Sequence, residues 1–443
     1  MAKAKKKESL TPEERLQAAL VPESEQPYPV PANWCWTRIG DILRLQAGKN
    51  ISASKISKNR SQEASFPCFG GNGVRGYVER YNHDGEFPII GRQGALCGNV
   101  NWASGKFYAT EHAVVVECSS IISKRWAYRI LFSMNLNQYA TATAQPGLSV
   151  AVINQVPIAL PPAQEQQRIV DRIESLFAKL DEAKQKTQDA LDSFETRKAA
   201  ILHKAFTGEL TAQWRKEHGV RMESWENLRL ENLIEGGPQN GLYKPQTAYG
   251  TGTKILRIDC FYEGAVLPWE NLKRLALSKN EIEQYHLNIN DIVINRVNSM
   301  AYLGKSALIR ELPEECVFES NMMRIALNTR MVIPEYAIKY LNSVIGVQEL
   351  RKNAKQAVNQ ASINQQDVKN VAIKLPKLDE QAEIVRLLDD LLAKEQQAKE
   401  AAEGVLGQID LIKKAILARA FRGELGTNNP SEESAVELLK VIV

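Results

Sequence analysis

Residues 160–185 read LPPAQEQQRIVDRIESLFAKLDEAKQ, and residues 375–400 read LPKLDEQAEIVRLLDDLLAKEQQAKE. These stretches open a duplication that runs without a gap to Leu210 and Leu425, with a constant offset of 215 residues and 21 identities in 51 positions. Average residue usage would give about three identities by chance. The chain is therefore built on an internal repeat.

Both copies of the repeat have the pattern of a long helix. Prolines mark the two starts, and Gly208 and Gly423 follow as stop signals. Apolar residues recur at steps of three and four, which is the spacing of a coiled-coil seam. The seam positions are Ile169, Ile173, Leu176, Leu180, Phe194 and Ile201 in the first copy, and Ile384, Leu388, Leu391, Val405, Ile409 and Ile416 in the second.

Two matching helices in one chain most simply pair with each other. A narrow, long seam favours an antiparallel coiled coil, which would relate the two halves of the chain by a pseudo-two-fold axis. In the alternative arrangement each helix packs on its own neighbouring domain.

Fainter echoes extend the repeat into the segments that precede the helices. WAYRIL, from Trp126, is echoed by YAIKYL, from Tyr336, and IIGRQGALCGNV, from Ile89, by VINRVNSMAYLGKS, from Val293. Short β-branched runs between Gly, Asn and Asp predict strands there, so the class is α+β. The predicted order is an N-terminal arm (1–29), head 1 (30–160), a spacer helix (161–210), head 2 (211–375), a second spacer helix (376–425) and a tail (426–443).

The composition is that of an ordinary globular protein without a membrane span, disulfides or a metal site. Its 443 residues are 44% hydrophobic and 24% charged, which is typical of globular proteins. The sequence lacks a run of about 18 apolar residues and a secretory leader, so we expect a cytoplasmic protein without a membrane partner. Six cysteines lie far apart and five histidines are scattered, which favours reduced thiols and no metal site.

The positive charge is concentrated in head 1. Residues 30–155 hold 13 Lys and Arg against 7 Asp and Glu, whereas residues 163–210 hold 8 against 9. This distribution favours an anionic partner for the head over an anionic partner for the helix.

The stretch FGGNGVRG, residues 69–76, contains the G-x-G-x-x-G spacing of a dinucleotide-binding turn. That turn requires a helix after the glycines, whose N-terminus meets the phosphates. The following residues, YVERYNHDGEFPIIG, are strand-like, so we expect a tight loop between strands. The sequence shows no P-loop and no catalytic set, which favours a binding module over an enzyme.

Polar and basic residues suited to DNA gather in segments of both heads. Arg matches the paired acceptors of guanine, Asn matches adenine, and Lys neutralises phosphate. The candidate DNA-binding residues are Lys49, Lys55, Lys58, Arg60, Arg75 and Arg92 in head 1, and Asn240, Lys244, Arg257, Asn295, Arg296 and Asn298 in head 2.

Over nearly its full length the chain resembles the DNA-specificity subunit of type I restriction–modification systems. The resemblance rests on the two EQ..IV helices ending in KAFTGEL and RAFRGEL, on FGGNGVRGY and IIGRQGALCGNV in head 1, and on DIVINRVNSMAYLGKSALI in head 2. It implies that each head is a target recognition domain and that the helices are spacers.

The resemblance also implies a division of labour. The chain would be non-catalytic and would read a bipartite site in double-stranded DNA, one half-site per head. Two modification subunits would supply adenine methylation with S-adenosylmethionine, and two restriction subunits would supply ATP- and magnesium-dependent translocation and cleavage, so this chain would hold no cofactor. Two alternatives remain: a nucleotide-binding enzyme that uses the Gly71–Gly76 loop, and a coiled-coil scaffold without DNA binding.

Overall fold

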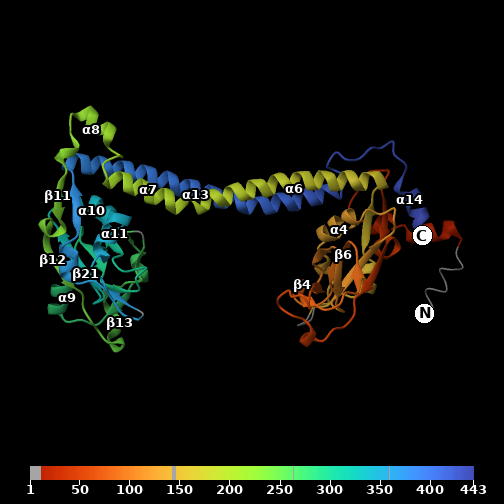
Figure 1. Cartoon of the computed structure of the whole chain (residues 1–443), viewed down its shortest axis with the longest axis horizontal. Helices are drawn as coiled ribbons and strands as arrows, with labels where there is room; N and C mark the ends of the chain where they lie inside the picture. Colours follow the sequence, from red (N-terminus) through yellow and green to blue (C-terminus); the bar gives the residue numbers. More distant parts are fainter. Residues whose placement is uncertain (1–10, 142–145, 263, 359) are drawn as a thin grey trace. The chain divides into compact units, whose positions relative to one another are not determined.

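A computed structural model describes residues 11–141, 146–262, 264–358 and 360–443, so the lysine-rich start lies outside the described residues. The chain divides into two compact units. Unit 1 combines residues up to 187 with residues 404–443, and unit 2 comprises residues 188–403. Each unit contains one β-rich head and a pair of helical segments (Figure 1).

Head 1 is built on two four-stranded sheets. The first has the order β2-β9-β6-β7, from strands Leu43–Ala47, Ala113–Cys118, Phe87–Gly91 and Val100–Ala103. The second has the order β4-β3-β8-β5, from strands Gly73–Val78, Phe66–Gly70, Lys106–Ala109 and His83–Asp84. Helix α4 (Lys124–Ser133) packs on β6 and β7, followed by η3 (Leu136–Tyr139) and α5 (Val150–Asn154).

Head 2 repeats the first of these sheets. Its order is β12-β21-β17-β19, from strands Ile234–Asn240, Met322–Leu327, Ile292–Asn295 and Ser306–Leu308. In both heads the strands adjoin in the chain order first, fourth, second, third. Helix α10 (Pro334–Leu341) packs on β19 as α4 packs on β6 and β7, and α11 (Val344–Arg351) follows. The upstream repeat predicted from the faint sequence echoes is therefore confirmed.

The remaining strands of head 2 form smaller sheets. A three-stranded sheet, β16-β13-β20, is formed by Lys273–Leu275, Tyr249–Leu256 and Cys316–Phe318. A second one, β18-β23-β22, is formed by Val297–Asn298, Ala361–Ser362 and Lys355–Gln356. Each head is closed by one antiparallel pair of terminal strands: β1 (Cys35–Arg38) with β10 (Pro157–Leu160), and β11 (Glu226–Arg229) with β24 (Ala372–Leu375).

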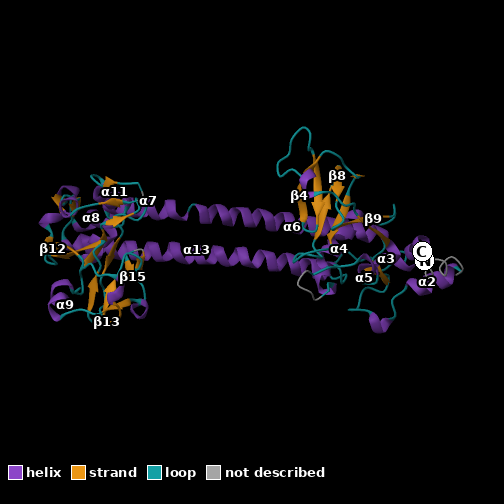
Figure 2. Ribbon diagram, turned by 90° about the horizontal axis from the view of Figure 1, so that it is seen from below, coloured by secondary structure: helices purple, strands orange, loops and turns teal. Residues whose placement is uncertain are grey.

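The spacer helices lie side by side within each unit (Figure 2). They are α6 (Ala163–Asp192), α7 (Phe194–Phe206) and α13 (Leu378–Ala420). In unit 1, Asp181 pairs with Lys413 and Lys184 pairs with Asp410 at 3.6 Å, so numbers rise along one helix as they fall along the other. In unit 2, Arg197 pairs with Glu395 at 2.9 Å.

The predicted seam is buried mainly where the helices meet the heads. Ile169 and Ile173 belong to the core of head 1, and Ile384 and Leu388 to the core of head 2. The helices therefore combine both arrangements considered from the sequence, pairing with each other and packing on the heads with their ends. Val405 is 41% exposed, so its assignment to the seam is wrong. The first spacer helix carries small or polar residues in its middle, such as Ala183 and Thr187. These side chains offer little apolar surface against which Val405 could be buried.

The first spacer helix is interrupted at Ser193, where the sequence predicts one continuous helix. The Ser193 hydroxyl donates to the Ala190 carbonyl at 2.9 Å, and an Arg197 guanidinium N–H donates to the same carbonyl at 3.1 Å. Side-chain donors thus occupy a carbonyl of the helical ladder, which is a recognised cause of a local break.

A buried carboxylate joins each spacer helix to its head. Glu165, in the first turn of α6, accepts from Trp34 Nε1 at 2.8 Å. Glu380, at the equivalent place in α13, accepts from Trp225 Nε1 at 2.9 Å. Both carboxylates are almost fully buried. The tryptophan that leads into each head is therefore fixed to the start of the helix that follows that head.

All six cysteines are free thiols, four of them buried, as the sequence predicts. Burial raises the pKa of the Cys35 thiol to about 12. Among the described residues, no group of His, Cys, Asp or Glu is arranged to hold a metal ion. Within the same residues, no helix has the length and apolar character needed to cross a membrane.

Candidate nucleic-acid interface

Five predicted DNA-binding cations of head 1 are exposed. Four of them follow β2 on a segment, residues 49–60, that is anchored by backbone contacts to Ala109 and Tyr77. Within the described part of the chain, no ion pair or side-chain hydrogen bond engages them. These residues are Lys49, Lys55, Lys58, Arg60 and Arg75. Exposed cations that no carboxylate of the described residues neutralises attract a polyanion strongly.

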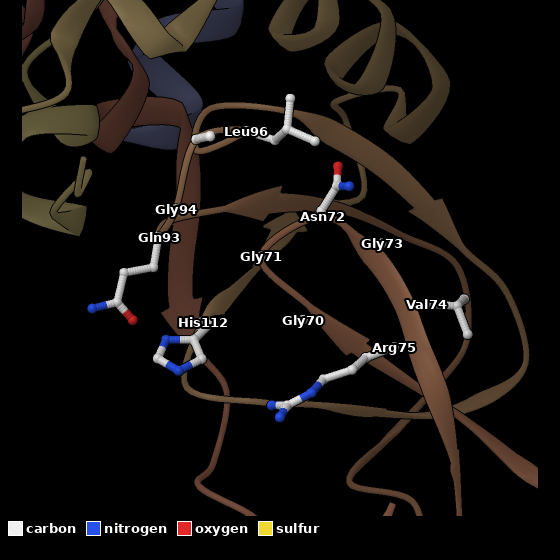
Figure 3. A pocket seen from close by; sticks show the side chains of 11 residues that line it. Gly70, Gly71, Asn72, Gly73, Val74, Arg75, Gln93, Gly94, Leu96 and His112 are labelled. Atoms are coloured by element: carbon white, nitrogen blue, oxygen red, sulfur yellow. The ribbon is translucent and has the colours of Figure 1, made fainter. Parts of the chain in front are cut away.

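Arg75 lies on the rim of a cleft of about 630 Å³ in head 1 (Figure 3). Three segments form the cleft: the β3–β4 hairpin, the loop after β6, and the turn between β8 and β9. The lining residues with side chains of more than one carbon are Asn72, Val74, Arg75, Gln93, Leu96 and His112. Figure 3 shows Asn72 and Leu96 on one side of Gly71, and Arg75, Gln93 and His112 on the other. The cleft therefore offers hydrogen-bonding and apolar groups together.

The glycines of FGGNGVRG form a turn between two strands. Strand β3 ends at Gly70 and pairs there with Gly73, where β4 begins. Because β4 is a strand, no helix N-terminus points at this turn, and the geometry of a dinucleotide-binding turn is absent. The predicted inter-strand loop is confirmed.

The same glycines bring two backbone segments into direct contact. A Cβ atom on Gly91 would lie 1.8 Å from the Gly71 carbonyl oxygen, and a Cβ atom on Gly71 would lie 2.7 Å from the Gln93 carbonyl oxygen. Only glycine permits such an approach. Gly71, which lines the cleft, is therefore packed directly against the backbone of Gly91 and Gln93.

Replacing Gly91 with alanine is expected to destabilise head 1 by about 3 kcal/mol or more, since no backbone atom near the new methyl group can move freely. Hydrogen exchange of peptides from residues 66–118 measures the effect. Gly70→Ala, on the same hairpin, is the control, because its nearest contacts are 3.6 Å away on the flexible Arg75 side chain. Equal protection in the two variants would contradict the prediction.

The predicted cations of head 2 are already partnered. Lys244 lies 2.6 Å from Glu281 and is the main reason that the pKa of this carboxyl falls to about 2. Arg257 lies 3.6 Å from Glu319. Arg296 donates to the Ser320 carbonyl at 2.9 Å. Carboxylates partly neutralise Lys244 and Arg257, whereas Arg296 is held in place by a hydrogen bond to a neutral carbonyl. These contacts distinguish the three side chains from the cations of head 1.

The predicted asparagines of head 2 differ in their access to solvent. Asn240 is exposed at the end of β12, and Asn298 is partly buried. Asn295 is fully buried at the end of β17, so contact with DNA would require its loop to move. In head 1, Arg92 is partly buried beside the cleft. Their roles as DNA contacts stay predictions.

Sequence reasoning missed several side chains that line the cleft. Asn72 accepts from the Asn99 side chain at 2.9 Å and keeps its own amide donors available. Gln93 and Leu96 lie within IIGRQGALCGNV, the segment echoed in head 2. The echo could have pointed to Gln93 and Leu96, because a loop that recurs in both heads is a candidate for a function that the heads share.

Comparison with known proteins gives matches in both halves of the chain. Residues 31–192 and 222–403 match the model of the type I restriction modification DNA specificity domain. A stretch of 141 residues, 31% of this chain, is 48% identical to the EcoprrI type I restriction enzyme specificity subunit of Escherichia coli, over 35% of that protein. A stretch of 304 residues, 66% of this chain, is 28% identical to the EcoKI specificity subunit of Escherichia coli strain K12, over 64% of its length. The chain thus spans less than two thirds of these two relatives.

Two solved structures share the fold. The HsdS subunit from Thermoanaerobacter tengcongensis superimposes with a TM-score of 0.58 at 19% identity, over 90% of this chain and 100% of that chain. A chain from a structural study of type I R-M system assembly and conformational transition superimposes with a TM-score of 0.62 at 18% identity, over the same shares. At these identities the likeness concerns the fold.

Proposed function

Since the chain belongs to the family of type I restriction modification DNA specificity proteins, we propose that it reads a bipartite site in double-stranded DNA, one half-site per head. The observation that carries this proposal is the cleft of head 1, which Arg75 lines, together with the exposed cations of residues 49–60. Charge draws the phosphates and positions the duplex, while cleft side chains meet base edges. The second head, which repeats the first, would read the second half-site.

The partners we propose are two modification subunits and two restriction subunits. Equivalent grooves in the two units support two copies of one partner. Unit 1 has a groove of about 800 Å³ between α4–η3 and the end of α13, and unit 2 has one of about 590 Å³ between α10 and α7. Their linings include equivalent residues of the repeat: Phe132 and Asn342, Met134 and Val344, and Leu417 and Leu202.

Catalysis and its cofactors belong to the partners in this proposal. S-adenosylmethionine would be bound by the modification subunits, and ATP and magnesium by the restriction subunits, in the cytoplasm. This chain would choose the site and would not react with it. The specificity of the whole assembly would then change with the heads alone.

Mapping of methylated adenines tests the proposal. DNA from cells that carry this chain with its modification subunits is expected to show one bipartite motif with a constant gap. Exchange of head 2 for that of a relative is expected to change one half of the motif and leave the other intact. A complex that binds no DNA would favour a scaffold instead, and a motif without two separate halves would contradict the proposal.

A further inference from the structure

The loop after β6 in head 1 and the loop after β17 in head 2 are the same structural element. In head 1, Gly98 N donates to Gly91 O at 2.7 Å, and Gly91 N donates to Asn99 O at 2.9 Å. In head 2, Gly304 N donates to Asn295 O at 2.9 Å, and Asn295 N donates to Lys305 O at 2.8 Å. These hydrogen bonds set Gly98 opposite Gly304, although the head 2 loop is longer.

Each loop is also fixed from outside by the same kind of contact. The carbonyl just before the glycine accepts from the Asn137 side chain in head 1, at 2.9 Å, and from Arg351 Nε in head 2, at 2.8 Å. Both donors belong to the element that follows the equivalent helices α4 and α10. The glycines have φ of +88° and +76°, which favours glycine at both places. The loops are therefore held firmly in one conformation.

One large apolar side chain stands exposed at the equivalent position of each loop. Leu96 O accepts from Asn99 N, and Tyr302 O accepts from Lys305 N, both at 3.2 Å, so the two residues correspond. Leu96 is 49% exposed and Tyr302 is 55% exposed. Single exposed apolar side chains are common on protein surfaces. An exposed one at the same place of a fixed loop in both heads points to a shared contact outside the head.

The change from leucine to tyrosine indicates what the contact is. A DNA target with two different half-sites requires a different side chain at each. The positions of both residues are consistent with this, because Leu96 lines the cleft of head 1 and Tyr302 follows Arg296 and strand β18, which contains Asn298.

We propose that Leu96 and Tyr302 are equivalent specificity-determining residues, each contacting the 5-methyl group of a thymine in the major groove of its own half-site. This inference rests on the proposed function. Apolar side chains recognise that methyl group. In head 1, Asn72 lies on the same side of the cleft as Leu96, so an A·T pair would meet an amide at adenine and an apolar side chain at thymine (Figure 3).

Replacement of thymine by deoxyuridine tests the proposal, since it removes only the methyl group. Each thymine of the mapped target is replaced in turn, and binding by the complex with modification subunits is measured. For the wild-type chain we expect about a fourfold loss at one position of each half-site, the effect of one buried methyl group. Leu96→Ala should abolish that sensitivity in the half-site of head 1 alone, and Tyr302→Ala in the half-site of head 2 alone.

Two controls use apolar side chains of the same heads that lie outside the loops. Val152→Ala in head 1 and Met331→Ala in head 2, which are 42% and 39% exposed, should leave the sensitivity at both half-sites unchanged. The inference is overturned if no thymine is sensitive, or if the sensitivity persists in the loop variants. If the wild-type complex binds no bipartite duplex, the proposed function fails as well, so the two failures are distinguishable.

Discussion

Alanine at Lys49, Lys55, Lys58 and Arg60 is expected to reduce the salt dependence of DNA binding by the complex with its modification subunits. Each phosphate contact contributes about 0.9 to the slope of log K against log salt. Loss of four contacts should therefore make this negative slope shallower by about 3.6. Titration of a fluorescent duplex at several salt concentrations measures it. All four side chains are exposed, and no side chain among the described residues pairs with them, so their removal leaves no buried group there without a partner.

A matched control removes the same charge from elsewhere in the chain. Alanine at four exposed lysines outside the heads' DNA-binding segments, Lys179, Lys204, Lys216 and Lys377, should leave the slope unchanged. Lys244→Ala in head 2 should change the slope by less than 0.9, because Glu281 already neutralises this lysine. Equal slopes for the quadruple head 1 variant and the wild type would show that residues 49–60 do not contact phosphate.

Glu380→Gln is expected to destabilise unit 2 by about 3–5 kcal/mol, the usual cost of breaking a buried ion pair. Glu380 accepts from Arg215 Nη1 at 2.6 Å and from Thr211 Oγ1 at 2.7 Å, in addition to Trp225. The Arg215 and Glu380 side chains are only 10% and 2% exposed. The variant would leave the guanidinium without a counter-charge and would turn an amide toward its donors. Hydrogen exchange of peptides from residues 205–230 and 375–390 measures the effect.

Glu165→Gln is the matched variant in unit 1. Glu165 accepts from Trp34, Thr427 and Asn428, all neutral donors, and Arg168 is paired with Glu432 at 2.7 Å. No cation loses its partner, so we expect a smaller cost of about 1–3 kcal/mol. Loss of protection in unit 1 as large as that in unit 2 would contradict this account of the Arg215–Glu380 pair.

Local patterns explain why so much of the fold was predictable. Helix formation depends on residues a few positions apart, so the heptads, the prolines before Ala163 and Leu378, and Gly208 and Gly423 predicted both spacer helices. The break at Ser193 was not predictable from that periodicity, because it depends on which side chains donate to one carbonyl. The exposure of Val405 likewise depends on the facing helix.

The candidate site, too, was predictable from the sequence only in part. The sequence located the cationic segments of both heads, but it could not distinguish them. Whether a lysine or arginine keeps its charge free depends on carboxylates that are distant in sequence, as in the pairs Lys244–Glu281 and Arg257–Glu319. The correspondence of Leu96 and Tyr302 was also hidden, since the head 2 loop is longer and only its backbone hydrogen bonds align the two residues.

By itself, the sequence determined the duplication, the two spacer helices, the two β-rich heads and the family. Each of these follows from composition and from the spacing of residues close together in the chain. Only the tertiary structure decided which cations have carboxylate partners, that Asn295 is buried, and that the Gly71 and Gly91 backbones lie in direct contact. The physical reason is that pairing, burial and close backbone approach are contacts between distant segments, and these contacts exist only once the chain has folded.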